Sequence, residues 1–181
     1  MNDKLVRKWN FTGPWNDERI ERWLERLAAE GLHLESVGAL GQYRFRRGAP
    51  GRVMYRIDVA MNRKKPDADY VQLMTDAGWR MAAEQGNLYY WRTSDPHAPE
   101  IFTDAASRAA KYERLARNYG LMLALSLLFF VKSAVVLYID GTLSKTETFL
   151  APLWTVLLAQ TLYAYRRLRA RIEAVRLAAA P

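Results

Sequence analysis

The sequence contains no cysteine, which excludes disulfide bonds, thiolate nucleophiles and cysteine-ligated zinc or iron–sulfur centres. Its two histidines, His33 and His97, are too few for a histidine-rich metal site. It also lacks a phosphate-binding glycine loop, a G-x-G-x-x-G turn, an H-E-x-x-H zinc motif and a G-x-S-x-G nucleophile elbow. We therefore expect no enzymatic activity, no cofactor and no bound metal.

Basic charge is abundant, and its position separates two classes of partner. The whole chain has a net charge of +8, but residues 1–105 contribute only +1 and residues 106–181 contribute +7. A nucleic-acid-binding domain concentrates basic residues in its folded part. Here the excess flanks two apolar segments, which indicates membrane topology and argues against nucleic acid as a partner.

Two apolar segments near the C-terminus predict transmembrane helices at residues 120–139 and 149–165, joined by a loop at 140–148. About 20 helical residues cover a hydrocarbon core of ~30 Å. The alternative is a buried helical pair in a soluble protein. Such a pair shows a polar stripe, and residues 121–139 have none.

The charges flanking these segments predict the orientation. The positive-inside rule places the basic tail at 166–181 and the predicted connecting helix at 99–119 in the cytoplasm. Both termini are then cytoplasmic, the 140–148 loop is external, and membrane lipid is a partner. The basic residues that carry this prediction are Lys111, Arg114, Arg117, Arg166, Arg167, Arg169, Arg171 and Arg176.

Lys132 and Gln160 are polar residues inside the predicted spans. Ionisable residues within a membrane are functional candidates, and Lys132 has Gln160 or Asp140 as possible partners. The alternative is that the lysine amine reaches the outer interface, about seven residues away.

Residues 1–98 form the predicted soluble domain, in which the pattern strand–helix–strand–strand occurs twice. Residues 23–34 (WLERLAAEGLHL) align with 70–81 (YVQLMTDAGWRM) at a constant offset of 47, and 43–47 then align with 88–92. This internal duplication predicts an α+β fold: one antiparallel sheet with two helices on one face, followed by a two-helix transmembrane hairpin.

Period-two alternation assigns the two faces of this predicted sheet. Trp9, Phe11, Tyr43 and Phe45 should lie beneath the helices. The opposite face is rich in arginine and suits a protein partner or a small acidic or aromatic ligand. The alternative is a solvated outer face. The residues predicted to contact a ligand or partner are Arg44, Arg46, Arg56, Tyr89 and Trp91.

Several separated motifs resemble the DUF2812 family of bacterial proteins of unknown function: WLERLAAEGLHL, YRIDVA, LMTDAGW, YYWRT and EIFTDAASRAAKYERL. Leu32 departs from the resemblance, since a tryptophan would be more typical there. The resemblance implies a domain without an assigned activity, often encoded beside a PadR-like transcription regulator. We expect a non-enzymatic, membrane-tethered binding or sensor module in the bacterial cytoplasmic membrane. A structural or assembly protein acting through its hairpin is the alternative.

Overall fold

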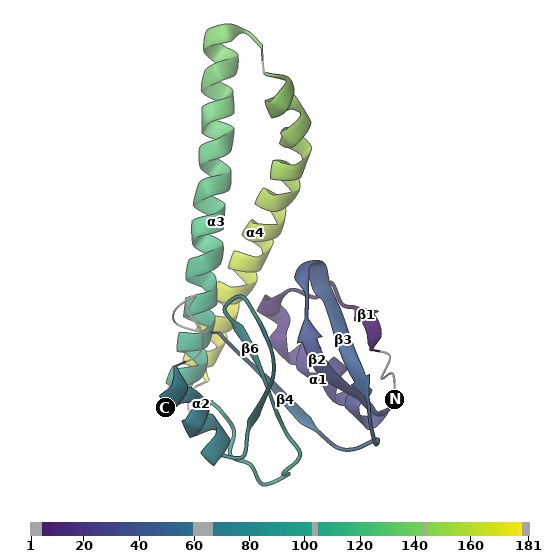
Figure 1. Cartoon of the computed structure of the whole chain (residues 1–181). Coiled ribbons are helices and arrows are strands. Elements are labelled where there is room, and N and C mark those ends of the chain that lie inside the picture. Colours follow the sequence, from purple (N-terminus) through teal and green to yellow (C-terminus); the bar gives the residue numbers. More distant parts are fainter. Residues whose placement is uncertain (1–4, 60–66, 103–104, 143, 179–181) are drawn as a thin grey trace. The chain divides into compact units, whose positions relative to one another are not determined.

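The computed structural model describes residues 5–59, 67–102, 105–142 and 144–178 (Figure 1). The chain divides into two units, residues 1–107 and residues 108–181. The elements of the first unit are β1 (Val6–Trp9), η1 (Pro14–Asn16), α1 (Asp17–Ala29), β2 (Leu32–Val37), η2 (Ala39–Gly41), β3 (Gln42–Arg47), β4 (Met54–Val59), α2 (Ala68–Asp76), β5 (Arg80–Gln85) and β6 (Leu88–Thr93).

The strands of the first unit form two three-stranded antiparallel sheets, in the orders β1-β3-β2 and β4-β6-β5. This confirms the α+β class with antiparallel pairing, but the prediction of one sheet is wrong. Both β2 and β5 contain a bulge, between Leu34 and Ser36 and between Met81 and Ala83. A bulge disrupts the hydrogen-bond ladder and increases the twist, and β2 and β5 lie close together without strand pairing.

Side chains link the two sheets instead. The Gln85 side-chain amide donates to the Gly38 carbonyl at 2.6 Å. The hydroxyls of Tyr43 and Tyr90 are 3.4 Å apart and their rings meet edge to face. The interior of the first unit is therefore shared between the sheets.

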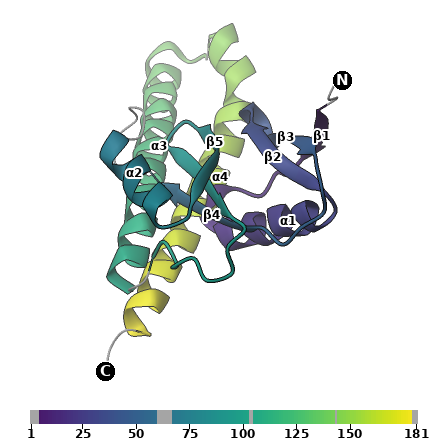
Figure 2. The same ribbon diagram turned by 60° about the horizontal axis from the view of Figure 1, so that its bottom comes forward.

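Helix α1 follows from its apolar spacing, because Ile20, Leu24 and Leu27 recur on one side and are buried. Trp23 packs edge to face on Tyr43 and Phe45 of the first sheet, with ring centroids 5.0 and 5.6 Å away. Figure 2 shows α1 beside β2 and β3. Gly31 ends the helix with φ +81°, a conformation that favours glycine.

Helix α2 packs on the second sheet from the opposite side. Tyr70 meets Trp91 edge to face at 5.7 Å, and Met74, Trp79, Tyr89 and Trp91 form a buried cluster. The intervening Tyr90 points the other way, toward Tyr43. Since neighbouring residues of a strand point to opposite faces, the two helices do not share one face as predicted.

The second unit consists of most of α3 (Ala105–Asp140) together with α4 (Lys145–Leu177). Contacts pair the two helices in antiparallel order: Phe129 stacks on Trp154 at 4.7 Å, and the Arg171 guanidinium donates to the Tyr112 hydroxyl at 3.1 Å. Ser144 and Glu147 form a capping box at the start of α4.

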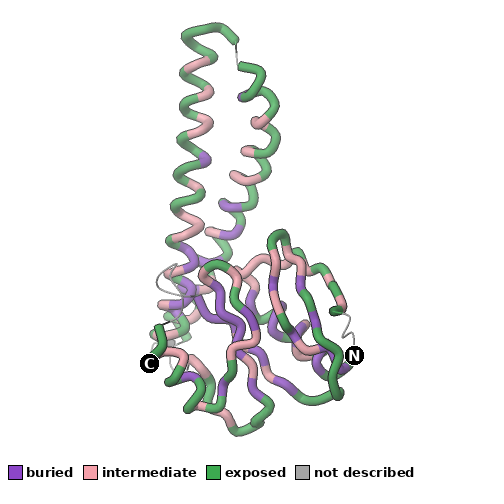
Figure 3. Tube along the Cα trace, viewed as in Figure 1, coloured by how far each residue is buried: buried purple, intermediate pink, exposed green. Residues whose placement is uncertain are grey.

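One of the described helices, over Ala106–Asp140, is long and apolar enough to cross a membrane. The predicted span at 120–139 lies inside it. The predicted span at 149–165 lies within α4, which does not meet the same measure of length and composition. Both helices are exposed over long stretches (Figure 3).

Candidate functional site

The structure does not bring the predicted ligand-contacting residues together. Arg44 and Arg46 lie on the outer face of the first sheet, opposite to Tyr43 and Phe45. Arg46 makes two hydrogen bonds to the Glu35 carboxylate, at 2.6 and 3.1 Å. Its guanidinium holds the pKa of Glu35 below the usual value. Arg46 is thus engaged within the fold.

Tyr89 and Trp91 are core residues. Their exposed fractions are 3% and 0%, so the prediction that they lie on an open face is wrong. In the structure, Trp91 pairs with Met81 in the second sheet, and Phe45 pairs with Leu34 at the corresponding place in the first sheet. The structural counterpart of Phe45 is therefore Trp91. The sequence alignment had matched Phe45 to Tyr90. A shift of one residue exchanges the two faces of a strand.

Lys132 and Gln160 also do not meet. The Lys132 amine forms an ion pair with Glu147 at 2.5 Å, whereas Gln160 is exposed on α4. Gln160 and Asp140 were the partners considered from the sequence. The three-residue spacing of Ser144 and Glu147, that of a capping box, indicates where α4 begins but does not identify Glu147 as the partner of Lys132.

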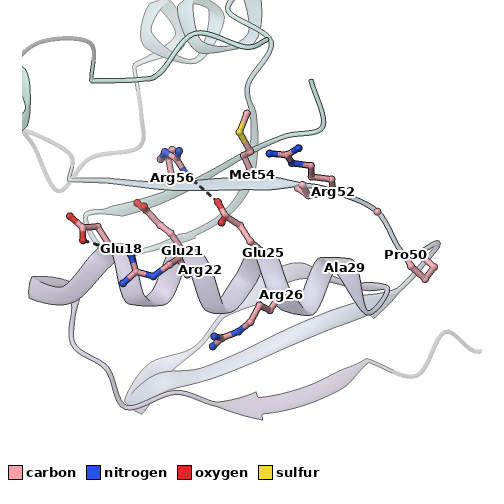
Figure 4. A pocket seen from close by; sticks show the side chains of 12 residues that line it. Glu18, Glu21, Arg22, Glu25, Arg26, Ala29, Pro50, Arg52, Met54 and Arg56 are labelled. Atoms are coloured by element: carbon pink, nitrogen blue, oxygen red, sulfur yellow. Dashed lines mark hydrogen bonds and ion pairs between the residues drawn. The ribbon is translucent and has the colours of Figure 1, made fainter. Parts of the chain in front are cut away.

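The candidate site is a groove of about 1050 Å³ between α1 and the segment that leads into β4 (Figure 4). Arg56, the third predicted arginine, lies on its wall. Figure 4 shows Glu21 and Glu25 pointing from α1 toward the strand that carries Met54 and Arg56. The lining residues are Glu18, Glu21, Arg22, Glu25, Arg26, Ala29, Pro50, Gly51, Arg52, Val53, Met54 and Arg56.

Arg56 joins three segments of the first unit. Its Nη1 donates to Glu25 of α1 at 3.2 Å. Its Nε and Nη2 donate to the two carboxylate oxygens of Glu100, at 2.9 and 2.5 Å. The hydrogen bond to Glu100 and the nearby charges of Glu21 and Glu25 raise the pKa of Arg56, while burial opposes them. Arg56 is therefore a permanent cation held between α1, β4 and the segment before α3.

Two carboxylates of α1 also bind the backbone of β4. The Ile57 amide donates to Glu21 at 2.8 Å, and the Tyr55 amide donates to Glu25 at 3.1 Å. Since β4 is an edge strand, these bonds satisfy donors that would otherwise be open to another strand. Neither Glu21 nor Glu25 was among the contact residues predicted from the sequence, so their role in the groove was missed.

The groove is lined by carboxylates, guanidiniums and apolar side chains. Among the described residues, its lining includes no Ser, Thr, Cys, His or Lys, and its charged side chains are those of three glutamates and four arginines. Within the same described residues, no group of three or more His, Asp or Glu side chains is placed to hold a metal ion. Arg52 is exposed at the rim and has no hydrogen-bond or ion-pair partner among the described residues.

Comparison with known proteins gives a family but no activity. No curated protein and no solved structure matches the chain significantly. Residues 16–125, more than half of the chain, match the family described as "Protein of unknown function (DUF2812)". The match covers α1, strands β2 to β6, α2 and the first part of α3, while β1 lies before it. This chain therefore belongs to the DUF2812 family.

Proposed function

We propose that this protein is a membrane-anchored, non-enzymatic sensor whose soluble unit binds an anionic ligand in the groove between α1 and β4. The observation that carries the proposal is the position of Arg56. It lines the groove and binds Glu100, which lies five residues before the start of α3. A ligand at Arg56 thus reaches the segment that leads to the long apolar helix.

The ligand class follows from the two guanidiniums on the strand side of the groove. Arg52 offers a cation that has no hydrogen-bond or ion-pair partner among the described residues, and Arg56 offers one that already binds carboxylates. A carboxylate or phosphate ligand makes the same charge-assisted bonds that Glu25 and Glu100 now make. Occupation of the groove then competes with Glu100 for Arg56 and loosens the segment at 99–102, which Trp79 also holds through a 2.8 Å bond to the Pro99 carbonyl.

The anchor in this proposal is a hairpin of two membrane-spanning helices with both ends in the cytoplasm. The exposed leucine, valine and phenylalanine side chains on α3 and α4 support it, because lipid is a favourable environment for such surfaces. Ion pairing of Lys132 with Glu147 lowers the cost of placing the lysine near the membrane.

An origin by duplication of the soluble unit is supported by matching details. Gly31 and Gly78 both follow a helix at positive φ and are separated by the predicted 47 residues. The bulges in β2 and β5 occur at Glu35 and Ala82, which are separated by the same number. Each half thus repeats the same helix end and the same irregular strand.

The family resemblance supports one extension of this proposal, in which the module acts together with a PadR-like transcription regulator.

The second candidate function is that of an assembly protein that acts through its membrane helices. It is favoured by Gln160 and Lys132, whose side chains are exposed on the helix pair and can bind another membrane protein.

Thermal unfolding of the full chain in detergent tests the groove. Carboxylates and phosphomonoesters are added in turn, and a bound ligand raises the Tm by mass action. The Arg52→Gln variant should lose this increase, while Arg80→Gln, an exposed arginine of β5 outside the groove, should retain it. An equal response of both variants to every anion would remove the groove from consideration. Faster amide exchange at residues 99–102 in the presence of ligand is expected for a sensor.

A further inference from the structure

Three large apolar side chains lie exposed together at one end of the first sheet. Trp9, Phe11 and Leu40 have exposed fractions of 55%, 79% and 83%. The rings of Trp9 and Phe11 stack at 6.0 Å. Trp9 pairs with Gln42 in the sheet, and the Asn10 amide donates to the Gly41 carbonyl at 2.9 Å. The end of β1 therefore lies beside the turn that carries Leu40. We call this set the apolar tip.

The turn displays Leu40 at a conformational cost. Leu40 has φ +57° and ψ +28°, a left-handed conformation that residues other than glycine, asparagine and aspartate rarely adopt. Its side chain gains no burial in return. A strained apolar residue that points to solvent is a candidate contact residue.

Two arginines lie next to the apolar tip on adjacent strands. Arg7 and Arg44 stand directly opposite each other on β1 and β3, and like charges in this position destabilise a sheet. Arg44 donates to the Gln42 side chain at 3.4 Å, and neither guanidinium has a carboxylate partner among the described residues. Arg46, farther along β3, is by contrast paired with Glu35.

We propose that the apolar tip, together with Arg7 and Arg44, is a docking site for the anionic surface of the membrane. Tryptophan and other large apolar side chains enter the interface, while arginines attract anionic headgroups. An anionic surface offsets the repulsion between the two arginines, and an apolar boundary receives Leu40. The inference rests on the proposed membrane anchor, which keeps a bilayer near the soluble unit at high effective concentration.

The test uses the absence of cysteine from the chain. Ala39→Cys places a single thiol beside Leu40 and leaves the apolar tip intact. Ala49→Cys, just past the opposite end of β3, is the matched control, since both alanines are exposed. Each full-length variant carries an environment-sensitive fluorophore and is reconstituted into nanodiscs of phosphatidylcholine, with or without phosphatidylglycerol. Spin-labelled lipid and iodide serve as the quenchers from the membrane and from water.

In anionic nanodiscs, the label at residue 39 should be quenched by the spin-labelled lipid and protected from iodide, unlike the label at residue 49. Replacement of Arg7 or Arg44 by Gln should lower the docked-to-undocked ratio about fivefold each. Leu40→Gly should also weaken docking, and its folding is secure because glycine prefers this backbone conformation.

Two results would overturn the docking proposal. One is equal behaviour of the two labels in both kinds of nanodisc. The other is protection from iodide without quenching by lipid, which would show that a protein surface covers the tip. Co-elution of the full chain with the nanodiscs reports the anchor separately, so a failed anchor is distinguished from a failed docking site.

Discussion

Arg56 and Glu100 face each other through two parallel hydrogen bonds, at 2.9 and 2.5 Å, across 44 residues of sequence. This paired geometry fixes the segment before α3 against β4. The Arg56 side chain is 23% exposed and that of Glu100 is 57% exposed, so water screens part of the attraction. The contact therefore acts mainly as a positional link, and its energetic contribution is moderate.

Replacing Arg56 by Gln should lower the free energy of unfolding by about 1–2 kcal/mol, because hydrogen bonds to charged groups contribute roughly that much after screening. Arg56→Lys should recover little, since an ammonium does not make the paired bonds. Urea unfolding of the full chain in detergent measures both. Arg80→Gln is the control, and a loss no larger than that of this control would contradict the importance of the link.

Glu21→Ala should destabilise the first unit by about 1–3 kcal/mol, because the Ile57 amide is left buried without an acceptor. Glu21→Gln keeps an acceptor oxygen and should cost less. Glu18→Ala removes an exposed carboxylate of the same helix and serves as the control. Faster amide exchange at Ile57 in the Ala variant alone would identify the lost bond; unchanged exchange there would refute the assignment.

Substitution can distinguish the buried Trp91 of β6 from the exposed Arg44 of β3. Trp91→Ala should cost about 3–5 kcal/mol, as expected for a fully buried aromatic residue. Arg44→Ser, on the outer face of β3, should change stability by less than about 0.5 kcal/mol. Chemical denaturation of both variants gives the comparison. If the Trp91→Ala variant lost as little stability as the Arg44→Ser variant, Trp91 would have to be exposed.

Trp91 and Arg44 also show where the alternation of apolar and polar residues predicts the buried face of a strand and where it does not. Alternation identified the covered Tyr43 and Phe45 in β3, whose other face is open. It did not do so in β6, where Leu88 to Trp91 are all buried, because a strand covered on both sides has no polar period. Trp9 was expected beneath a helix, but its pairing with Gln42 places it on the same face as Arg44.

Helix ends were easier to predict than the groove. Gly31 and Gly78, which occupy equivalent positions in the two aligned segments, follow α1 and α2, and this signal is local because glycine suits the positive φ after a helix. The contacts of Glu25 with Tyr55 and of Arg56 with Glu100 join residues 30 and 44 positions apart. Their side chains meet only because of strand order and helix placement, which no local pattern specifies.

Stability should fall at alkaline pH through Tyr43 and Tyr90. Burial raises the pKa of both hydroxyls. In the unfolded chain, tyrosine ionises near pH 10, whereas the folded protein retains the protons. The contribution is therefore complete below pH ~10 and is lost as the pH rises through the raised values. Urea midpoints at successive pH values should fall less steeply for Tyr43→Phe/Tyr90→Phe; equal slopes would contradict the assignment.

Lys132 and Glu147 should contribute to stability only when both are present. Glu147→Gln leaves the lysine without a counter-charge in the apolar stretch of α3 at residues 120–139, so the Tm of the full chain in detergent should fall. Lys132→Met alone leaves the carboxylate, 7% exposed, without its cation and should also lower the Tm. The double variant removes both charges and should recover most of the loss, since replacing a whole ion pair is often neutral. Additive losses in this cycle would show that the two residues act independently, and that Glu147 contributes only through its capping of α4.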